Sequence, residues 1–122
     1  MKNLHLIISI VIVIPIGCIY GFFPDLLFDV TLNSIDEANI FKAIMGSYLA
    51  FSTLWILGIL KPSFWKIATV SNILFMFGLA FGRIVSIAFD GVPTTIFVLG
   101  IVGELVLGLY ALFQLKKEKS LE

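Results

Sequence analysis

The chain has 122 residues, of which 60% are hydrophobic and only 13% are charged, and its mean hydropathy is +1.11. A soluble domain of this length cannot bury so much apolar surface, so the composition indicates an integral membrane protein. The eight basic and eight acidic residues cancel, which argues against a nucleic-acid-binding surface, where a basic patch is expected.

Four apolar runs of the sequence are long enough to cross a bilayer, whose hydrocarbon core of about 30 Å takes about 20 helical residues. They cover residues 4–23, 40–60, 67–89 and 95–115. The connections between them are too short to hold a second domain. We therefore expect residues 1–122 to form a single transmembrane domain, an all-α integral membrane bundle of four helices in up-down-up-down order.

The first run is a span rather than a cleaved signal peptide. Gly17-Cys18 resembles a lipoprotein cleavage site, but Pro15 stands where such a site has a branched apolar residue, and hydrophobic residues continue to Phe23. Pro24 then ends the helix, because the residue before a proline is pushed out of the helical region.

The connection that follows carries two local signals. Residues 25–30 are short and amphipathic, which predicts a turn or two of helix lying in the membrane interface. Ser34 and Glu37 have the spacing of a capping box, in which the serine hydroxyl and the glutamate carboxylate accept amide hydrogens at a helix start. The second helix should begin there.

Basic residues gather on the side shared by the two termini and the second connection, whereas Lys42 is the only lysine near the other side. Those on the first side are Lys2, Lys61, Lys66, Lys116, Lys117 and Lys119. Because positive charge marks the cytoplasmic side, we expect both termini to be cytoplasmic and the acidic first connection to lie outside.

Two ionisable residues lie deep inside apolar runs. Arg83 precedes Asp90, at the outer end of the third run, by seven residues, about 10 Å, and Glu104 follows Thr95 by nine residues, about 14 Å. These depths allow the two side chains to pair. An intramembrane charge costs about 2.5–3.5 kcal/mol to insert and is by default a functional-site hypothesis. A purely structural ion pair is the alternative.

Further polar residues are expected near this pair. Helical spacing aligns Arg83 with Asn72, Ser86 and Asp90 on one stripe, and the second run places Tyr48 and Asn39 in the same outer half. Gly100 and Gly108 lie on the face of Glu104, which predicts a groove around the carboxyl group. We therefore predict a ligand-binding pocket that opens outward and is formed by Arg83, Glu104, Tyr48, Asn39, Ser86, Asn72 and Asp90. For Asn72, Ser86 and Tyr48, a hydrogen bond between helices is the alternative.

Nothing in the sequence supports catalysis. It has no set of nucleophile, base and orienting group, no glycine-rich phosphate loop and no cluster of metal ligands, since His5 and Cys18 each stand alone. We expect neither a catalytic residue nor a metal or cofactor.

The polar residues also resemble those of a known family. Asn39 with Lys42 and Gly46-Ser47-Tyr48, then Gly82-Arg83, Ser86 and Asp90-Gly91-Val92-Pro93, and finally Glu104 are similar to the pattern of the DUF4345 family. The resemblance implies a small four-span bacterial membrane protein of unknown function, similar in plan to DoxX-like proteins and located in the inner membrane. Lys42 stands where the family is expected to prefer arginine.

Three functions are compatible with these observations. The leading hypothesis is a non-enzymatic membrane protein whose Arg83–Glu104 pocket binds a small amphipathic or lipid-like ligand. The second is a transporter or proton-coupled carrier, which four helices would form most easily as a homodimer. The third, implied by the resemblance, is an accessory subunit of a quinone-linked redox complex.

Overall fold

The computed structural model describes residues 1–121. Over these residues the chain is all helical, and four of its helices are long and apolar enough to span a membrane. These are α1 (Leu4–Phe22), α3 (Ile35–Leu60), α4 (Pro62–Asp90) and α5 (Thr95–Ser120), and a short helix, α2 (Pro24–Leu27), follows α1. The predicted all-α membrane fold is thereby confirmed. Helices α3, α4 and α5 extend past the apolar runs, because a helix continues into polar sequence until a cap or proline ends it.

The helix ends follow from local chemistry. Ser34 caps α3: its Oγ accepts the N–H of Glu37 at 3.1 Å, and Glu37 Oε2 accepts the N–H of Asn33 at 2.6 Å. The predicted capping box is therefore present, with the carboxylate reaching one residue further back than the serine. Helix α4 begins with Pro62, which needs no amide partner at a first helical position, and ends before Gly91, whose φ of 101° favours glycine.

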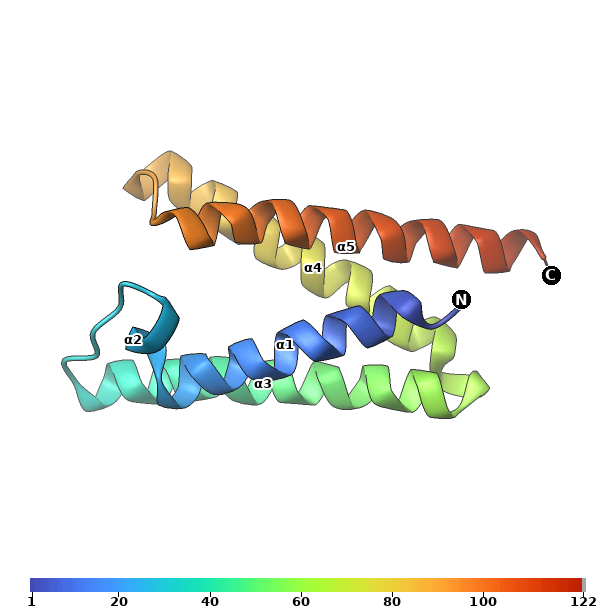
Figure 1. Cartoon of the computed structure of the whole chain (residues 1–122), viewed down its shortest axis with the longest axis horizontal. Helices are drawn as coiled ribbons and strands as arrows, with labels where there is room; N and C mark the ends of the chain where they lie inside the picture. The colour runs from blue at the N-terminus through green and yellow to red at the C-terminus, as the bar shows by residue number, and fades with distance from the viewer. Residues whose placement is uncertain (122) are drawn as a thin grey trace.

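Helices that are consecutive spans pack as antiparallel neighbours, α1 on α3, α3 on α4 and α4 on α5. Figure 1 shows α4 running obliquely from the α3–α4 turn at the lower right to the upper left of the view, away from α3. Helix α5 then returns along α4 at the top of the view. The α1/α3 pair and the α4/α5 pair thus separate towards the end that carries α2. The two termini lie together at the opposite end, where Lys2 Nζ is 3.7 Å from Glu118 Oε2.

Two glycines allow close contacts between α3 and its neighbours. A Cβ added at Gly17 on α1 would lie 2.9 Å from the Cβ of Tyr48, and one added at Gly58 on α3 would collide with the Cβ of Ala68. By contrast, Gly46 faces open space. The α1–α3 and α3–α4 contacts therefore depend on the absence of a side chain at positions 17 and 58.

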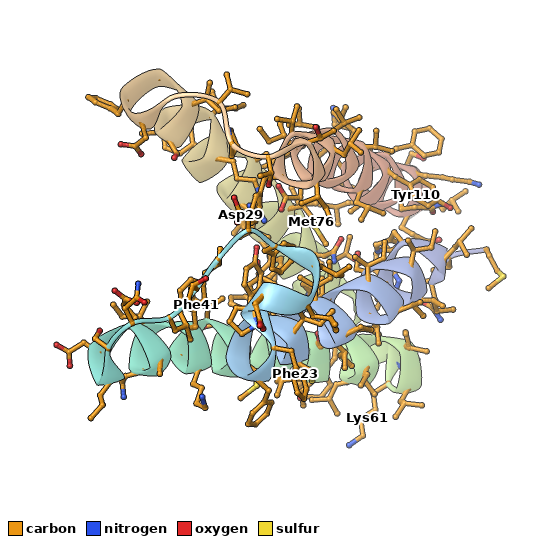
Figure 2. All side chains as sticks on the ribbon, turned by 60° about the vertical axis from the view of Figure 1, so that its left-hand side comes forward. Phe23, Asp29, Phe41, Lys61, Met76 and Tyr110 are labelled. Atoms are coloured by element: carbon orange, nitrogen blue, oxygen red, sulfur yellow. The ribbon has the colours of Figure 1, made fainter. Side chains whose placement is uncertain are left out.

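The core runs along the middle of the bundle and is not purely apolar. Leu6, Trp55 and Ala68 are fully buried, and Met76, labelled in Figure 2 where the helices converge, is 2% exposed. Lys61, also labelled there, lies at the outer surface of the α3–α4 turn. Many large apolar side chains on the outer faces of the helices are exposed, which is the surface expected against lipid.

Candidate functional site

Arg83 on α4 and Glu104 on α5 form an ion pair inside the bundle. Arg83 Nε lies 2.9 Å from Glu104 Oε1 and 3.2 Å from Oε2, so one N–H is shared between both carboxylate oxygens. Arg83 Nη2 also donates to the hydroxyl of Tyr20 on α1 at 3.3 Å. The side chains of Arg83 and Glu104 are 22% and 11% exposed. The two charges are therefore largely removed from solvent and compensate each other.

A set of stacked aromatic rings lies beside the guanidinium group. Arg83 Cζ lies 5.5 Å from the ring centre of Phe97 on α5, within the range of a cation–π contact. Phe28, just after α2, stacks between Tyr20 and Phe97 with ring centres 4.8 and 4.9 Å away. The ring of Tyr48 on α3 meets that of Tyr20 edge-on at 5.6 Å. This stack links α1, the α2 connection and α5 around one arginine.

A cavity of about 610 Å³ lies beside the pair; we call it the large cavity. Its walls come from α1, α3, α4 and the start of α5. Arg83 is the only charged residue among those that line it. Ser47, Gly78 and Gly82 are exposed lining residues, and a Cβ at either glycine would meet nothing within 4 Å. The cavity therefore opens between α3 and α4, on the side of the bundle that faces lipid.

A second cavity of about 120 Å³, the small cavity, reaches deeper. Arg83 and Tyr48 line both cavities, whereas Glu104, Val13 and Met76 line only the small one. Arg83 thus stands between an open apolar cavity and a smaller space that contains its carboxylate partner.

The structure brings together only part of the predicted set. Arg83, Glu104 and Tyr48 lie around the two cavities, and Ser86 lines the large cavity while its hydroxyl donates to Asp90 Oδ2 at 3.0 Å. Asp90 itself is exposed at the end of α4 and lines neither cavity, and the same holds for Asn39 on α3. Asn72 is fully buried but lies three turns of α4 away from Arg83, beyond both cavities. Their role in ligand binding stays a prediction.

The expected glycine groove around Glu104 is present only in part. A Cβ at Gly103 would meet open space, and one at Gly100 would lie 3.9 Å from Arg83 Nε. At Gly108, however, the ring of Phe77 from α4 fills the position, with its Cε1 2.6 Å from an added Cβ. The expectation of open space at Gly108 is therefore wrong, because the glycine serves the α4–α5 contact.

Sequence reasoning did not include Tyr20, Phe28 and Phe97 in the site. Tyr20 gives the arginine its second hydrogen bond, Phe97 lies against the guanidinium group, and Phe28 stacks on Phe97. Tyr20 follows Gly17 by three residues and so shares the face of α1 that packs on α3. The position of Tyr20 on the packing face of a spanning helix was the sequence signal that could have placed it in the site.

The guanidinium group retains donors for a further partner. Of its five N–H groups, the one on Nε is bonded to Glu104 and one on Nη2 to Tyr20, and the others donate to none of residues 1–121. Within that range there is also no group of three His, Cys, Asp or Glu side chains that could hold a metal ion. The remaining N–H groups of Arg83 can therefore donate hydrogen bonds to an acceptor at the wall of the apolar cavity.

Fold and composition together define a small membrane protein with four spanning helices. The chain belongs to the family described as "Domain of unknown function (DUF4345)", which matches residues 1–115 and so confirms the resemblance noted in the sequence. No curated protein and no solved structure matches the chain.

Proposed function

We propose that this protein is a non-enzymatic, multi-pass protein of the bacterial inner membrane that binds a small amphipathic or lipid-like ligand in the large cavity. The polar head of the ligand lies against Arg83, and its apolar part lies between α3 and α4. Both termini are cytoplasmic in this proposal, because Lys2, Lys66 and Lys119 line one cavity and so lie at the same end of the bundle.

One observation carries the proposal: a largely apolar cavity has a single charged residue in its wall, and that residue has N–H donors to spare. Concave apolar sites with few convergent polar groups are the usual form of small-molecule sites. Ile44, Phe75 and Leu79 supply apolar wall, and the gap at Gly78 and Gly82 gives entry from the lipid phase.

The charge balance of the site favours a ligand head with a hydrogen-bond acceptor. Glu104 already neutralises Arg83, since Glu104 Oε1 lies 2.9 Å from Arg83 Nε. A neutral ester or carbonyl head group can therefore accept hydrogen bonds from the free N–H groups without charge repulsion. A carboxylate head would approach Glu104 and be disfavoured by the like charge. We therefore expect monoolein to bind better than oleate.

Native mass spectrometry of the purified protein tests this proposal. Delipidated protein is incubated with monoolein or with oleate, and the fraction carrying one bound molecule is measured. Gly78→Leu places a side chain in the large cavity, and Gly46→Leu is the matched control, because Gly46 is equally open but lies outside that cavity. We expect Gly78→Leu to lose the adduct and Gly46→Leu to keep it. Equal retention in both variants, or no adduct with the parent, would refute the proposal.

The carrier and accessory-subunit hypotheses make different predictions. A proton-coupled carrier reconstituted in liposomes should show a flux that Glu104→Gln changes, whereas the binding protein should show none. An accessory subunit should copurify from its native membrane with a redox partner or a quinone. Fusion of alkaline phosphatase to the C-terminus tests the orientation separately, since the enzyme is active only outside the cytoplasm.

A further inference from the structure

A set of buried polar side chains lies in the half of the bundle that carries the termini. His5 and Ser9 come from α1, Ser52 from α3, and Thr69 and Asn72 from α4, and each is at most 1% exposed. We call these residues the buried polar cluster. They are distinct from the Arg83–Glu104 site, since neither the large nor the small cavity includes them.

Most of this cluster is not hydrogen-bonded within the part of the chain that the structure describes. His5 Nε2 and Thr69 Oγ1 are bonded at 2.9 Å, but His5 Nδ1, Ser9 Oγ, Ser52 Oγ and both amide atoms of Asn72 have no protein partner among residues 1–121. Leaving a polar group without a hydrogen bond inside a membrane bundle is energetically unfavourable. Buried polar atoms without a protein partner are usually bonded to ordered water.

The helix register places Ser9, Ser52 and Asn72 at one depth. The His5–Thr69 bond aligns α1 with α4, and from it Ser9 is about 6 Å along α1 and Asn72 about 4.5 Å along α4 in the same direction. Trp55 Nε1 donates to Ser71 Oγ at 3.1 Å, which aligns α3 with α4. Because α3 runs the opposite way, Ser52 lies about 4.5 Å beyond Trp55 towards the same level.

We propose that Ser9, Ser52 and Asn72 bind internal water molecules in the middle of the bundle. The hydrogen-bonding needs of Asn72 favour water over a cation. Its unpaired Nδ2 needs an acceptor, and its unpaired Oδ1 needs a donor. Water supplies both, whereas a cation would satisfy only the oxygens. The cluster also contains no carboxylate that could balance the charge of a cation.

On its terminal side the cluster approaches a further cavity. A third cavity, of about 260 Å³, is lined there by Lys2, Trp65 and Glu118. The ring of Trp65 is 5.8 Å from that of His5, and its buried Nε1 likewise has no hydrogen bond to the described residues. Buried polar atoms of Trp65, His5 and Asn72 that lack a partner among the described residues thus lead from the terminal cavity into the cluster.

On its other side the cluster approaches the small cavity. Val13 follows Ser9 by four residues and Met76 follows Asn72 by four, so each lies one helical turn further along, and both line the cavity that contains Glu104. Val13 and Met76 thus form an apolar layer between the bound water and Glu104.

Water-edited solid-state NMR of the protein in lipid bilayers tests this inference, because it measures how fast magnetisation passes from water to each side chain. We expect a build-up at the Asn72 amide and at the Ser9 Cβ several-fold faster than at Ala68 and Ala80, which are equally buried. Build-up at Asn72 as slow as at the two alanines would overturn it.

Two variants on α3 sharpen the test. Ser52→Val removes one hydroxyl from the cluster and should slow the transfer to Asn72. Thr53→Val is the matched control, because Thr53 is exposed and bonds only to the carbonyl of Leu49 at 2.8 Å. It should leave the transfer unchanged. A shift of the Asn72 signals when sodium replaces potassium would assign the site to a cation and refute the water proposal.

Discussion

Replacing Arg83 and Glu104 singly and together separates a ligand site from a structural tie. Arg83→Leu leaves a carboxylate whose side chain is 11% exposed without its donor, and we expect a loss of about 3–5 kcal/mol in the free energy of unfolding. Glu104→Leu should cost less within that range, because Arg83 is 22% exposed and keeps its bond to Tyr20.

The double variant Arg83→Leu with Glu104→Leu should fold about as well as the parent, because two leucines need no charge partner. Because each single variant costs about 3–5 kcal/mol, the summed single costs should exceed the double cost by about 6 kcal/mol or more. Titration with SDS, followed by the fluorescence of the two buried tryptophans, Trp55 and Trp65, measures these differences. The double variant should nevertheless lose the monoolein adduct. Retention of the adduct in a well-folded double variant would show that the pair is only a structural tie.

The ion pair at the chain termini provides the matched control for this cycle. Lys2 and Glu118 are 3.7 Å apart, but their side chains are 46% and 28% exposed. An exposed pair is typically worth only about 0–1 kcal/mol. Lys2→Gln, Glu118→Gln and the double variant should therefore all resemble the parent in stability and in adduct formation. A large coupling at this pair would refute the reasoning that burial sets the cost.

Other substitutions test the fold at single points, each by SDS titration. Gly58→Val should lower the free energy of unfolding by about 1–3 kcal/mol, because its Cβ collides with Ala68, whereas Gly46→Val, in open space, should not. Gly91→Ala should cost about 1–3 kcal/mol, because φ is 101° there. Ser34→Ala should cost about 1 kcal/mol by removing the cap of α3, and Ser34→Asp should restore it. A neutral Gly58→Val or Ser34→Ala would contradict the packing or capping described here.

The sequence predicted the spans because membrane insertion depends on local composition. An apolar run of about 20 residues must be helical in lipid, since its backbone has no other hydrogen-bond partners there. The capping box at Ser34 and Glu37 and the helix break at Pro24 are equally local, and the structure has both of them. The depths of Arg83 and Glu104 followed from the rise of each helix, so their pairing could be predicted as well.

The site as a whole was decided by helix rotation and tilt, which no local pattern encodes. Asn39 had a suitable depth but faces outward, and Gly108 is filled by Phe77 because α5 is turned that way against α4. Helical periodicity gives a residue's face only relative to its own helix.

What the sequence by itself determined is therefore the class of protein, the spans and the depth of each charge, since these depend on composition and on a fixed rise per residue. Only the tertiary structure brought Tyr20 to Arg83, opened the large cavity where α4 diverges from α3, and enclosed Asn72 without a partner among the described residues. The reason is physical: close contacts such as those at Gly17 and Gly58 set the angles between helices, and small changes in those angles move side chains by several ångströms at the far end.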